Sequence, residues 1–291
     1  MSTPESLDIG FIGLGIMGRH MAGHLQQAGH RLHLYNRSSG GAQALLERGA
    51  TWYDQPADVA RASDALFTMV GFPADVEALY LGERGLIAAA RPGALLIDAT
   101  TSSPALAQRI AEQASARGLH ALDAPVSGGE VGARDARLSI MVGGNALAFE
   151  RALPLLKTLG QNVVLQGDAG AGQHTKMANQ IVIASTMIGV SEGLAYASRS
   201  GLDPHRVLSS IRGGAAGSFL LDGMGARMLN GDYAPGFFTE HFIKDLGIAL
   251  AEAQRMGLDL PGLALAKKLY DGLAAAGHAR DGTQVLFEHY R

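Results

Sequence analysis

A glycine-rich turn between an apolar strand and a helix constrains the fold of this chain more than any other feature. The apolar run Asp8 to Ile12 precedes the turn, and a helical pattern from Arg19 to Ala28 follows it. The glycines have the spacing G-x-G-x-x-G, which permits a tight turn, a close approach of backbone to a pyrophosphate, and packing of the helix on the strand. A glycine-rich turn with no ligand is the alternative. The residues expected to bind a dinucleotide here are Gly13, Leu14, Gly15, Ile16, Met17 and Gly18.

Short apolar runs alternate with helical patterns from Leu7 to about Gly167, and after that point only helical periodicity continues. Such alternation is typical of βαβ units and a parallel sheet. We therefore expect an α/β fold with a Rossmann-like parallel sheet domain over residues 1–168 and an all-α domain over residues 169–291. The runs predicted as strands are LDIGFIGLG, RLHLYNR, ALFTMV, ALLIDAT, HALDAP and LSIMVGG.

The second half is predicted to begin with an unusually long helix, from near Gln173 to Ser200. At about 1.5 Å per residue this helix would be about 40 Å long, which suits a spine between domains and between subunits. Further helices are expected over Pro204–Arg212, Phe242–Met256 and Leu263–Ala276.

Composition excludes several classes of function. The chain has no cysteine, which rules out disulfides, zinc–thiolate sites and thiol catalysis. A net charge of −3 provides no basic field for nucleic acid or an anionic membrane. The N-terminal MSTPESLDIG has no basic segment before its first apolar run, so we expect a cytoplasmic protein without a secretory signal. Polar residues interrupt the apolar stretch Ile181 to Ala197, which favours a buried helix over a membrane span.

The end of the second predicted strand bears on the choice of nucleotide. An NAD-preferring fold would place an acid about 20 residues after the glycines, to accept hydrogen bonds from the ribose. This chain has Asn36, Arg37 and Ser38 there, and no carboxylate in this stretch to repel a 2′-phosphate. Because a guanidinium can form a charged fork with a phosphate, we expect NADP, with NAD as the alternative cofactor. An arginine that stacks on adenine or lies in solvent is the competing interpretation.

Five sequence segments in order along the chain carry a family resemblance: FIGLGIMGRHMAGHL, DAPVSGG, GAGQHTKMANQ, IRGGAAGS and PGFFTEHFIKDL. Together they resemble the β-hydroxyacid dehydrogenase family, and the pairing of KMANQ with IRGGAAGS is most similar to the tartronate semialdehyde (2-hydroxy-3-oxopropionate) reductases. The resemblance implies an NAD(P)-dependent dehydrogenase that interconverts a small β-hydroxyacid and its semialdehyde. Tartronate semialdehyde is the first expected substrate, and the alternatives are 3-hydroxyisobutyrate, succinic semialdehyde and glyoxylate.

Lys176 is the residue that the resemblance marks as general acid and base, with Asn179 orienting the substrate. Near the start of a long helix, helix-end dipoles and partial burial are both expected to lower the lysine pKa. Asn179 follows at i+3, so both side chains emerge on one helical face. From spacing alone, an exposed lysine in a first helical turn is the more ordinary interpretation. Gln180 stands where many relatives have a second asparagine, which disfavours 3-hydroxyisobutyrate.

The stretch Ser127, Gly128 and Gly129 follows a predicted strand at the sheet edge where open α/β sheets bind ligands. Successive glycine N–H groups and a hydroxyl can form an anion-binding concavity. The resemblance assigns this stretch to the substrate carboxylate, and an ordinary strand-to-loop turn is the alternative.

Met69 and Val70 end one predicted strand, and Thr101 follows the next, so these residues are expected to flank the nicotinamide and its ribose. Capping of the following helices is the other role open to Thr101. Lys244 corresponds to a lysine that the family places near the nicotinamide end of the cofactor, although a solvated helical face would also carry such a residue.

Two expectations concern partners. The long helix is apolar on most of its faces, more than one domain would usually cover, so a homodimer or homotetramer is expected. No metal site is expected, because the ten histidines show neither HxxxH nor HExxH spacing. The rival from another class is a non-catalytic dinucleotide-binding module used for assembly. The residues that argue against it are Lys176, Asn179 and Lys244.

Overall fold

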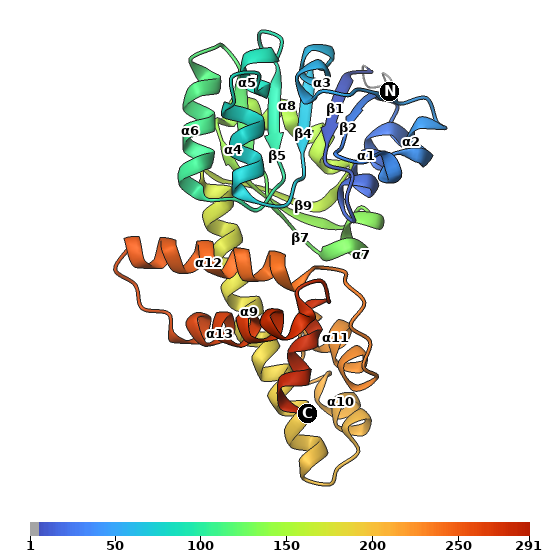
Figure 1. The fold of residues 1–291 in the computed structure, drawn as a ribbon, viewed down its shortest axis with the longest axis vertical. Coiled ribbons are helices and arrows are strands. Elements are labelled where there is room, and N and C mark those ends of the chain that lie inside the picture. Colours follow the sequence, from blue (N-terminus) through green and yellow to red (C-terminus); the bar gives the residue numbers. More distant parts are fainter. Residues whose placement is uncertain (1–5) are drawn as a thin grey trace. The chain divides into compact units, whose positions relative to one another are not determined.

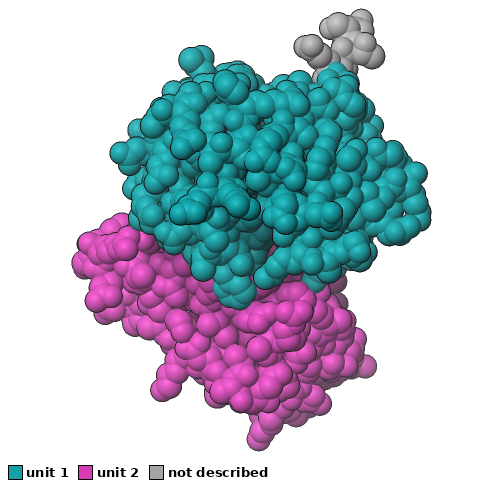
Figure 2. Space-filling model, turned by 45° about the horizontal axis from the view of Figure 1, so that its top comes forward, with its two compact units in different colours: residues 1–176 teal, residues 177–291 magenta. Residues whose placement is uncertain are grey.

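The computed structural model describes residues 6–291. They divide into two compact units, a first over residues 1–176 and a second over residues 177–291 (Figure 2). The division falls inside the helix α9 (Ala171–Arg199), whereas the predicted domain boundary after residue 168 remains a prediction. Residues 1–5, on which part of the expectation about a leader rested, lie outside the described residues.

The first unit is built on one sheet, which has nine strands among the described residues. The strand order is β3-β2-β1-β4-β5-β6-β8-β7, and β9 pairs with β8. All pairings are parallel except β6 with β8 and β7 with β8. The strand bounds are β1 Asp8–Ile12, β2 Arg31–Tyr35, β3 Thr51–Trp52, β4 Ala65–Thr68, β5 Leu95–Asp98, β6 His120–Asp123, β7 Val126–Ser127, β8 Leu138–Gly144 and β9 Gly160–Gly167.

Each of the six predicted apolar runs contains a strand, and the parallel-dominated fold class is confirmed. The sequence did not single out β3, β7 or β9. The first two are two residues long, too short to show a period, and the third is largely exposed, so it lacks the apolar run of a strand buried on both faces. The two antiparallel pairings also escaped prediction, because strand direction at the sheet edge depends on which strands meet.

Helices cover both faces of this sheet (Figure 1). Side chains that alternate along each strand feed two separate cores. Leu66 and Leu96 pack with one set of helices (α3 to α6), while Phe67 and Ile97 pack with the other (α1, α2, α7 and α8). The bounds are α1 Gly18–Gln27, α2 Gln43–Leu46, α3 Pro56–Ala62, α4 Pro73–Leu81, α5 Leu86–Ala89, α6 Pro104–Ser115, α7 Gly129–Arg134 and α8 Ala146–Lys157, with a short 3₁₀ turn at Ser39–Gly41.

The second unit is entirely helical among its described residues. Its core is one apolar cluster around Phe242, Tyr270 and the inner face of α9. The helix α11 was not expected, because two glycines weaken its helical pattern. Its start is fixed by Ser218, whose side chain accepts a hydrogen bond from Leu221 N at 3.0 Å. The bounds are α10 Pro204–Ile211, α11 Phe219–Leu229, α12 Thr239–Arg255 and α13 Pro261–Leu273, followed by a π-helical turn at Ala274–His278 and a 3₁₀ helix at Thr283–Tyr290.

By length and composition, α9 could cross a membrane, and 33% of its most apolar 18-residue window is buried within the described chain. The helix also buries polar side chains: Gln173, Gln180 and Ser191 are at most 1% exposed. Burial of partnered amides is typical of a helix inside a protein core. The exposed remainder of α9 includes Val182 and Tyr196, which are 66% and 76% exposed.

Candidate active site

The glycine-rich turn joins β1 to α1 and has the shape that a bound pyrophosphate requires. Gly13 has φ +98°, and a β-carbon there would lie 2.1 Å from the carbonyl oxygen of Met69. A β-carbon at Gly18 would lie 1.9 Å from the carbonyl oxygen of Gly13, so both positions are closed to any side chain. A β-carbon at Gly15 would meet no atom of the described residues within 4 Å. The open space lies where the motif brings a dinucleotide closest to the backbone, so the turn fits that group.

The three residues after β2 have different surroundings. Asn36 faces the glycine-rich turn, where its Oδ1 accepts from Leu14 N at 3.3 Å and its Nδ2 donates to the Ser38 carbonyl at 2.8 Å. Arg37 is 84% exposed, and its guanidinium lies 4.0 Å from the carboxylate of Asp75. The stretch after β2 has no carboxylate of its own, but Asp75 on α4 lies close to it, a contact that the local sequence does not predict. An ion pair this long and exposed is weak, so it does not hold Arg37 away from a phosphate.

The ends of β4 and β5 are hydrogen-bonded to each other. Val70 N donates to Thr100 Oγ1 at 3.0 Å, so the segments that hold Met69, Val70 and Thr101 lie at one edge of the sheet. Thr101 is half-buried, and the cap of α6 is Ser103, whose side chain accepts from Leu106 N at 3.2 Å. The structure therefore places the capping role at Ser103.

Asp98, the last residue of β5, is a buried carboxylate that the sequence analysis did not single out. Its Oδ1 accepts from Thr68 Oγ1 at 2.7 Å and from Thr100 N at 3.0 Å. Thr68 Oγ1 is also 2.8 Å from the hydroxyl of Tyr80. Burial raises the pKa of Asp98 to about 6, against the opposing effect of these hydrogen bonds. The carboxylate thus holds together the ends of the strands that carry Val70 and Thr101.

Lys176 lies within α9 and is 7% exposed. Its Nζ donates to the carbonyl oxygen of Val126 at 2.8 Å. Val126 precedes Ser127, Gly128 and Gly129, and both glycines have positive φ, at +134° and +62°. The structure therefore places the predicted proton donor beside the stretch predicted to hold the substrate carboxylate.

Asp123, at the end of β6, caps the helix that carries Lys176. Its carboxylate accepts from Gly170 N and Gln173 N, both at 2.8 Å. Burial raises its pKa, and the backbone hydrogen bonds oppose that rise. The positive end of the α9 dipole therefore faces a carboxylate of the chain itself, a contact that the helix-dipole argument from sequence had not included.

In the second unit, Asn179 begins a chain of polar contacts. Its Nδ2 donates to Gln180 Oε1 at 2.7 Å, and Gln180 Nε2 donates to Asp245 Oδ2 at 2.6 Å. Lys244 Nζ lies 3.1 Å from Asp245 Oδ1, and the two side chains are 12% and 1% exposed. Asn179 and Lys244, predicted separately from distant segments, are thus connected through Gln180 and Asp245. The lysine is in a mostly buried ion pair and is not part of a solvated face.

His241 lies one turn before Lys244 on α12. Burial lowers its pKa and the charge of Lys244 lowers it further, against the opposing effect of Glu240 and Asp245. Its ring packs edge-on against Phe238, with centroids 5.6 Å apart.

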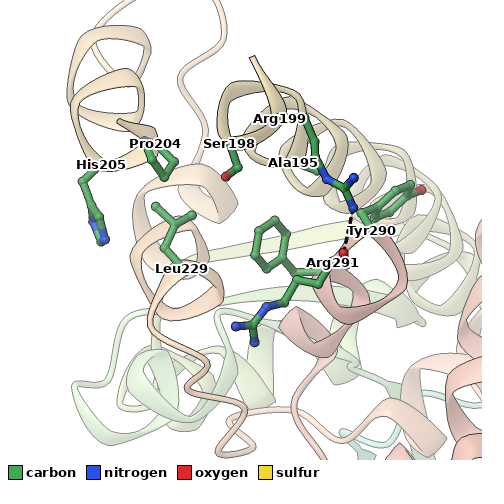
Figure 3. Close-up of a pocket in the computed structure, with 9 residues that line it drawn as sticks. Ala195, Ser198, Arg199, Pro204, His205, Leu229, Tyr290 and Arg291 are labelled. Atoms are coloured by element: carbon green, nitrogen blue, oxygen red, sulfur yellow. Dashed lines mark hydrogen bonds between the residues drawn. The ribbon is translucent and has the colours of Figure 1, made fainter. Parts of the chain in front are cut away.

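A shallow pocket of about 300 Å³ opens near the C-terminal end of α9 (Figure 3). Its charged side chains are already engaged: Arg199 donates to the Arg291 carbonyl at 2.9 Å, and Arg291 donates to Glu288 at 2.8 Å. None of the predicted site residues lines it. We therefore do not assign the predicted chemistry to this pocket.

Two family models match consecutive segments of the chain. Residues 8–167 match the domain family described as the NAD binding domain of 6-phosphogluconate dehydrogenase. Residues 170–290 match the family described as the NAD-binding domain of NADP-dependent 3-hydroxyisobutyrate dehydrogenase.

Individual relatives cover nearly all of the chain. The uncharacterized oxidoreductase YkwC of Bacillus subtilis (strain 168) is 53% identical over 96% of this chain and 97% of its own. The 2-hydroxy-3-oxopropionate reductase of Escherichia coli (strain K12) is 43% identical over 93% of this chain and 92% of its own. Among solved structures, a 3-hydroxyisobutyrate dehydrogenase of Mycobacterium tuberculosis with L-serine is 30% identical, with a TM-score of 0.87 over 99% of this chain and 100% of that one.

Proposed function

The chain belongs to the β-hydroxyacid dehydrogenase family, and from that premise we propose that it reduces tartronate semialdehyde to glycerate with NADPH. The chain is an NAD(P)-dependent oxidoreductase that acts on the CH–OH group of small β-hydroxyacids. What we propose is its particular substrate, tartronate semialdehyde, and its preference for NADPH.

The observation that carries the proposal is the hydrogen bond of Lys176 Nζ to the Val126 carbonyl, next to Ser127, Gly128 and Gly129. An enzyme that acts on a β-hydroxyacid needs a proton donor a few ångströms from the group that binds the carboxylate. The reason is that only two carbons separate the substrate's carboxylate from its reacting oxygen. The contact between Lys176 and Val126 supplies that short separation within one unit.

The proposed reaction requires little from the protein beyond orientation and one proton. The dinucleotide, when bound, supplies the hydride that reaches the aldehyde carbon. Lys176 Nζ donates its proton to the aldehyde oxygen as negative charge develops there, and takes it back in the oxidative direction. Backbone N–H groups of Gly128 and Gly129, with the Ser127 hydroxyl, hold the carboxylate. Asn179, whose amide is oriented by Gln180, is proposed to hold the substrate hydroxyl.

The preference for NADP rests on Arg37. The chain has no acidic residue between β2 and the 3₁₀ turn at Ser39–Gly41, and the exposed guanidinium can meet a 2′-phosphate. Asp75 is the nearby charge that opposes such binding. Met69, Val70 and Thr101 are proposed to contact the nicotinamide and its ribose, and Lys244 to lie near the nicotinamide end.

Tartronate semialdehyde and the semialdehyde of 3-hydroxyisobutyrate differ at one carbon, where the first carries a hydroxyl and the second a methyl group. A polar site discriminates strongly between the two, since a substrate that lacks the hydroxyl leaves buried polar groups without a partner. Asn179, Gln180 and Asp245 form such a polar set in the second unit. Gln180 in place of asparagine and the 43% identical reductase both favour the hydroxylated substrate.

We also propose a homodimer or homotetramer in the cytoplasm, with no nucleic-acid or membrane partner. Support for self-association comes from α9, where 33% of an apolar 18-residue window is buried in the described chain and where Val182 and Tyr196 are exposed. In a cyclic homo-oligomer, the same apolar face of a second copy of the chain would cover this surface.

The test is NADPH oxidation measured with tartronate semialdehyde, methylmalonate semialdehyde, succinic semialdehyde and glyoxylate. The highest kcat/KM is expected with tartronate semialdehyde, by about tenfold or more over the methyl analogue. A higher value with methylmalonate semialdehyde would replace the proposed substrate by 3-hydroxyisobutyrate. Turnover of none of the four would reject the substrate class.

A further inference from the structure

Gln173 has a side chain that joins two parts of the first unit which the proposed function uses separately. It is 0% exposed. Its Oε1 accepts from Ser102 N at 2.9 Å, and its Nε2 donates to the Thr100 carbonyl at 2.8 Å. Both ends of the amide therefore bind the backbone of the segment after β5, on either side of Thr101. A donor on one side and an acceptor on the other fix which way the amide faces.

The backbone of Gln173 is held as firmly as its side chain. Gln173 N donates to Asp123 Oδ2, and Gly170 N donates to Asp123 Oδ1, both at 2.8 Å. A β-carbon at Gly172 would lie 2.4 Å from the Met141 carbonyl and 2.7 Å from that of Asp123. The first turn of α9 therefore packs closely against the end of β6 and against β8.

Lys176 follows Gln173 by three residues, so it stands about one turn further along the same helix, about 4.5 Å along the axis. A rigid helical turn transmits any displacement of Gln173 to Lys176. The segment that Gln173 binds is also joined to Val70 through Thr100 Oγ1 at 3.0 Å. The contacts thus run without a break from the predicted nicotinamide-binding segments to the predicted proton donor.

We propose that Gln173 is a positioning residue: its amide fixes the Thr100–Ser102 segment relative to the first turn of α9 and so aligns Lys176 with the bound nicotinamide. The proposal rests on the proposed function. Hydride and proton reach adjacent atoms of one carbonyl group, and displacements of about 1 Å in such a geometry can lower a rate by about a hundredfold. The competing explanation is a buried amide that stabilises the fold without any part in alignment.

Gln173→Met tests the proposal, since methionine has a similar volume and removes both hydrogen bonds. Gln284→Met is the matched control. Gln284 is 1% exposed and donates from Nε2 to the carbonyls of Asp232 and Ala234, at 3.0 and 3.1 Å, in the second unit. Both variants lose buried hydrogen bonds and are expected to lower the melting temperature. Only Gln173→Met is expected to lower kcat, by about tenfold or more.

A double-mutant cycle with Lys176→Ala separates alignment from simple destabilisation. If Gln173 acts through the lysine, Gln173→Met lowers kcat about tenfold with Lys176 present and less than about twofold in the Lys176→Ala background. An equal loss in both backgrounds, or an equal loss of kcat in Gln284→Met, would overturn the proposal. NADPH affinity measured by fluorescence is expected to change less than about threefold in Gln173→Met.

Hydrogen–deuterium exchange tests the same linkage without any substrate. NADPH is expected to protect residues 98–104 and 170–177 together in the wild-type chain, but only residues 98–104 in Gln173→Met. Joint protection in both proteins would overturn the proposal. Loss of turnover with every semialdehyde, combined with the expected exchange pattern, would reject the substrate class and leave the positioning role in place.

Discussion

The two units bury their polar side chains in different ways. In the first unit the buried polar groups, apart from Ser63 at the end of α3, gather where β4, β5 and β6 end and α9 begins. They are Thr68, Asp98, Thr100, Ser102, Asp123, Gln173 and Lys176. In the second unit they are spread over three helical segments, as Gln180, Ser191, Thr239, Asp245, Glu252, Thr283 and Gln284.

The difference follows from the geometry of the elements. Parallel strands all end at the same edge of a sheet, so residues distant in sequence meet there and short motifs mark the place. A helix distributes its side chains around its axis and along its length. Polar residues of different helices therefore do not converge at one common edge. Motifs therefore predict a candidate site in the first unit, whereas in the second unit the candidate residues are connected by contacts such as that of Gln180 with Asp245. Five experiments test that contrast.

Removal of the lysine in the first unit should have the largest effect. Lys176→Ala is expected to lower kcat by about 10²–10⁴-fold, because a general acid acts in the transition state. NADPH affinity and the melting temperature should stay close to those of the wild type. A variant that retains more than about a tenth of the wild-type kcat would show that the proton comes from elsewhere.

Arg37→Ala is the next test in the first unit. Loss of a charge-assisted contact with a phosphate weakens binding by about 1.5–3 kcal/mol, or roughly 10- to 150-fold in KM for NADPH, and NADH should be little affected. Arg84→Ala, which removes the same charge from another exposed position, is the control. Equal weakening of both nucleotides would mean that Arg37 does not contact the 2′-phosphate.

Gln180→Met carries the comparison into the second unit. It breaks the link between Asn179 and Asp245, so KM for the semialdehyde is expected to rise about tenfold, in keeping with one or two lost hydrogen bonds. Gln254→Met, at an exposed position on α12, should leave KM unchanged. An unchanged KM in both variants would show that the second unit does not contribute to substrate binding. The candidate site would then lie in the first unit alone.

Assembly provides a test of the α9 surface. Light scattering at micromolar concentration should give at least twice the 30.3 kDa chain mass. Val182→Glu combined with Tyr196→Glu should return the mass to that of one chain, because both side chains are exposed on α9. A measured mass of 30.3 kDa for the wild-type protein would show that it is a monomer and that this surface faces solvent.

Asp98 should have the smallest effect, seen in stability. Its pKa is raised from 3.8 to about 6 in the folded state, so the folded chain holds the proton more tightly than the unfolded chain. The stability that this provides is complete below about pH 4 and is lost as the pH rises through about 6. Asp98→Asn cannot ionise, so its melting temperature relative to wild type should be a few degrees higher at pH 8 than at pH 4.5.

Asp259→Asn, exposed in the second unit, is the control for this pH dependence. Its melting temperature should follow that of the wild type at both pH values. A constant difference between Asp98→Asn and wild type across this range would show that the Asp98 proton is not linked to folding.

The sequence by itself determined the features that depend on neighbouring residues. The six apolar runs, the glycine spacing at residues 13–18 and the helical second half are local patterns, and each predicted the right kind of element. The family segments likewise pointed to Lys176, Asn179 and Lys244 before any contact was known.

Only the tertiary structure decided which distant groups meet. Asp98, Asp123 and Gln173 resemble ordinary polar residues in the sequence, and their partners are 2 to 73 positions away. The antiparallel pairing of β7 with β8 and the approach of Asp75 to Arg37 belong to the same class. Periodicity and spacing report which face of an element is apolar. They do not report which groups of another element will satisfy a buried carboxylate or amide, because that depends on the packing of the whole unit.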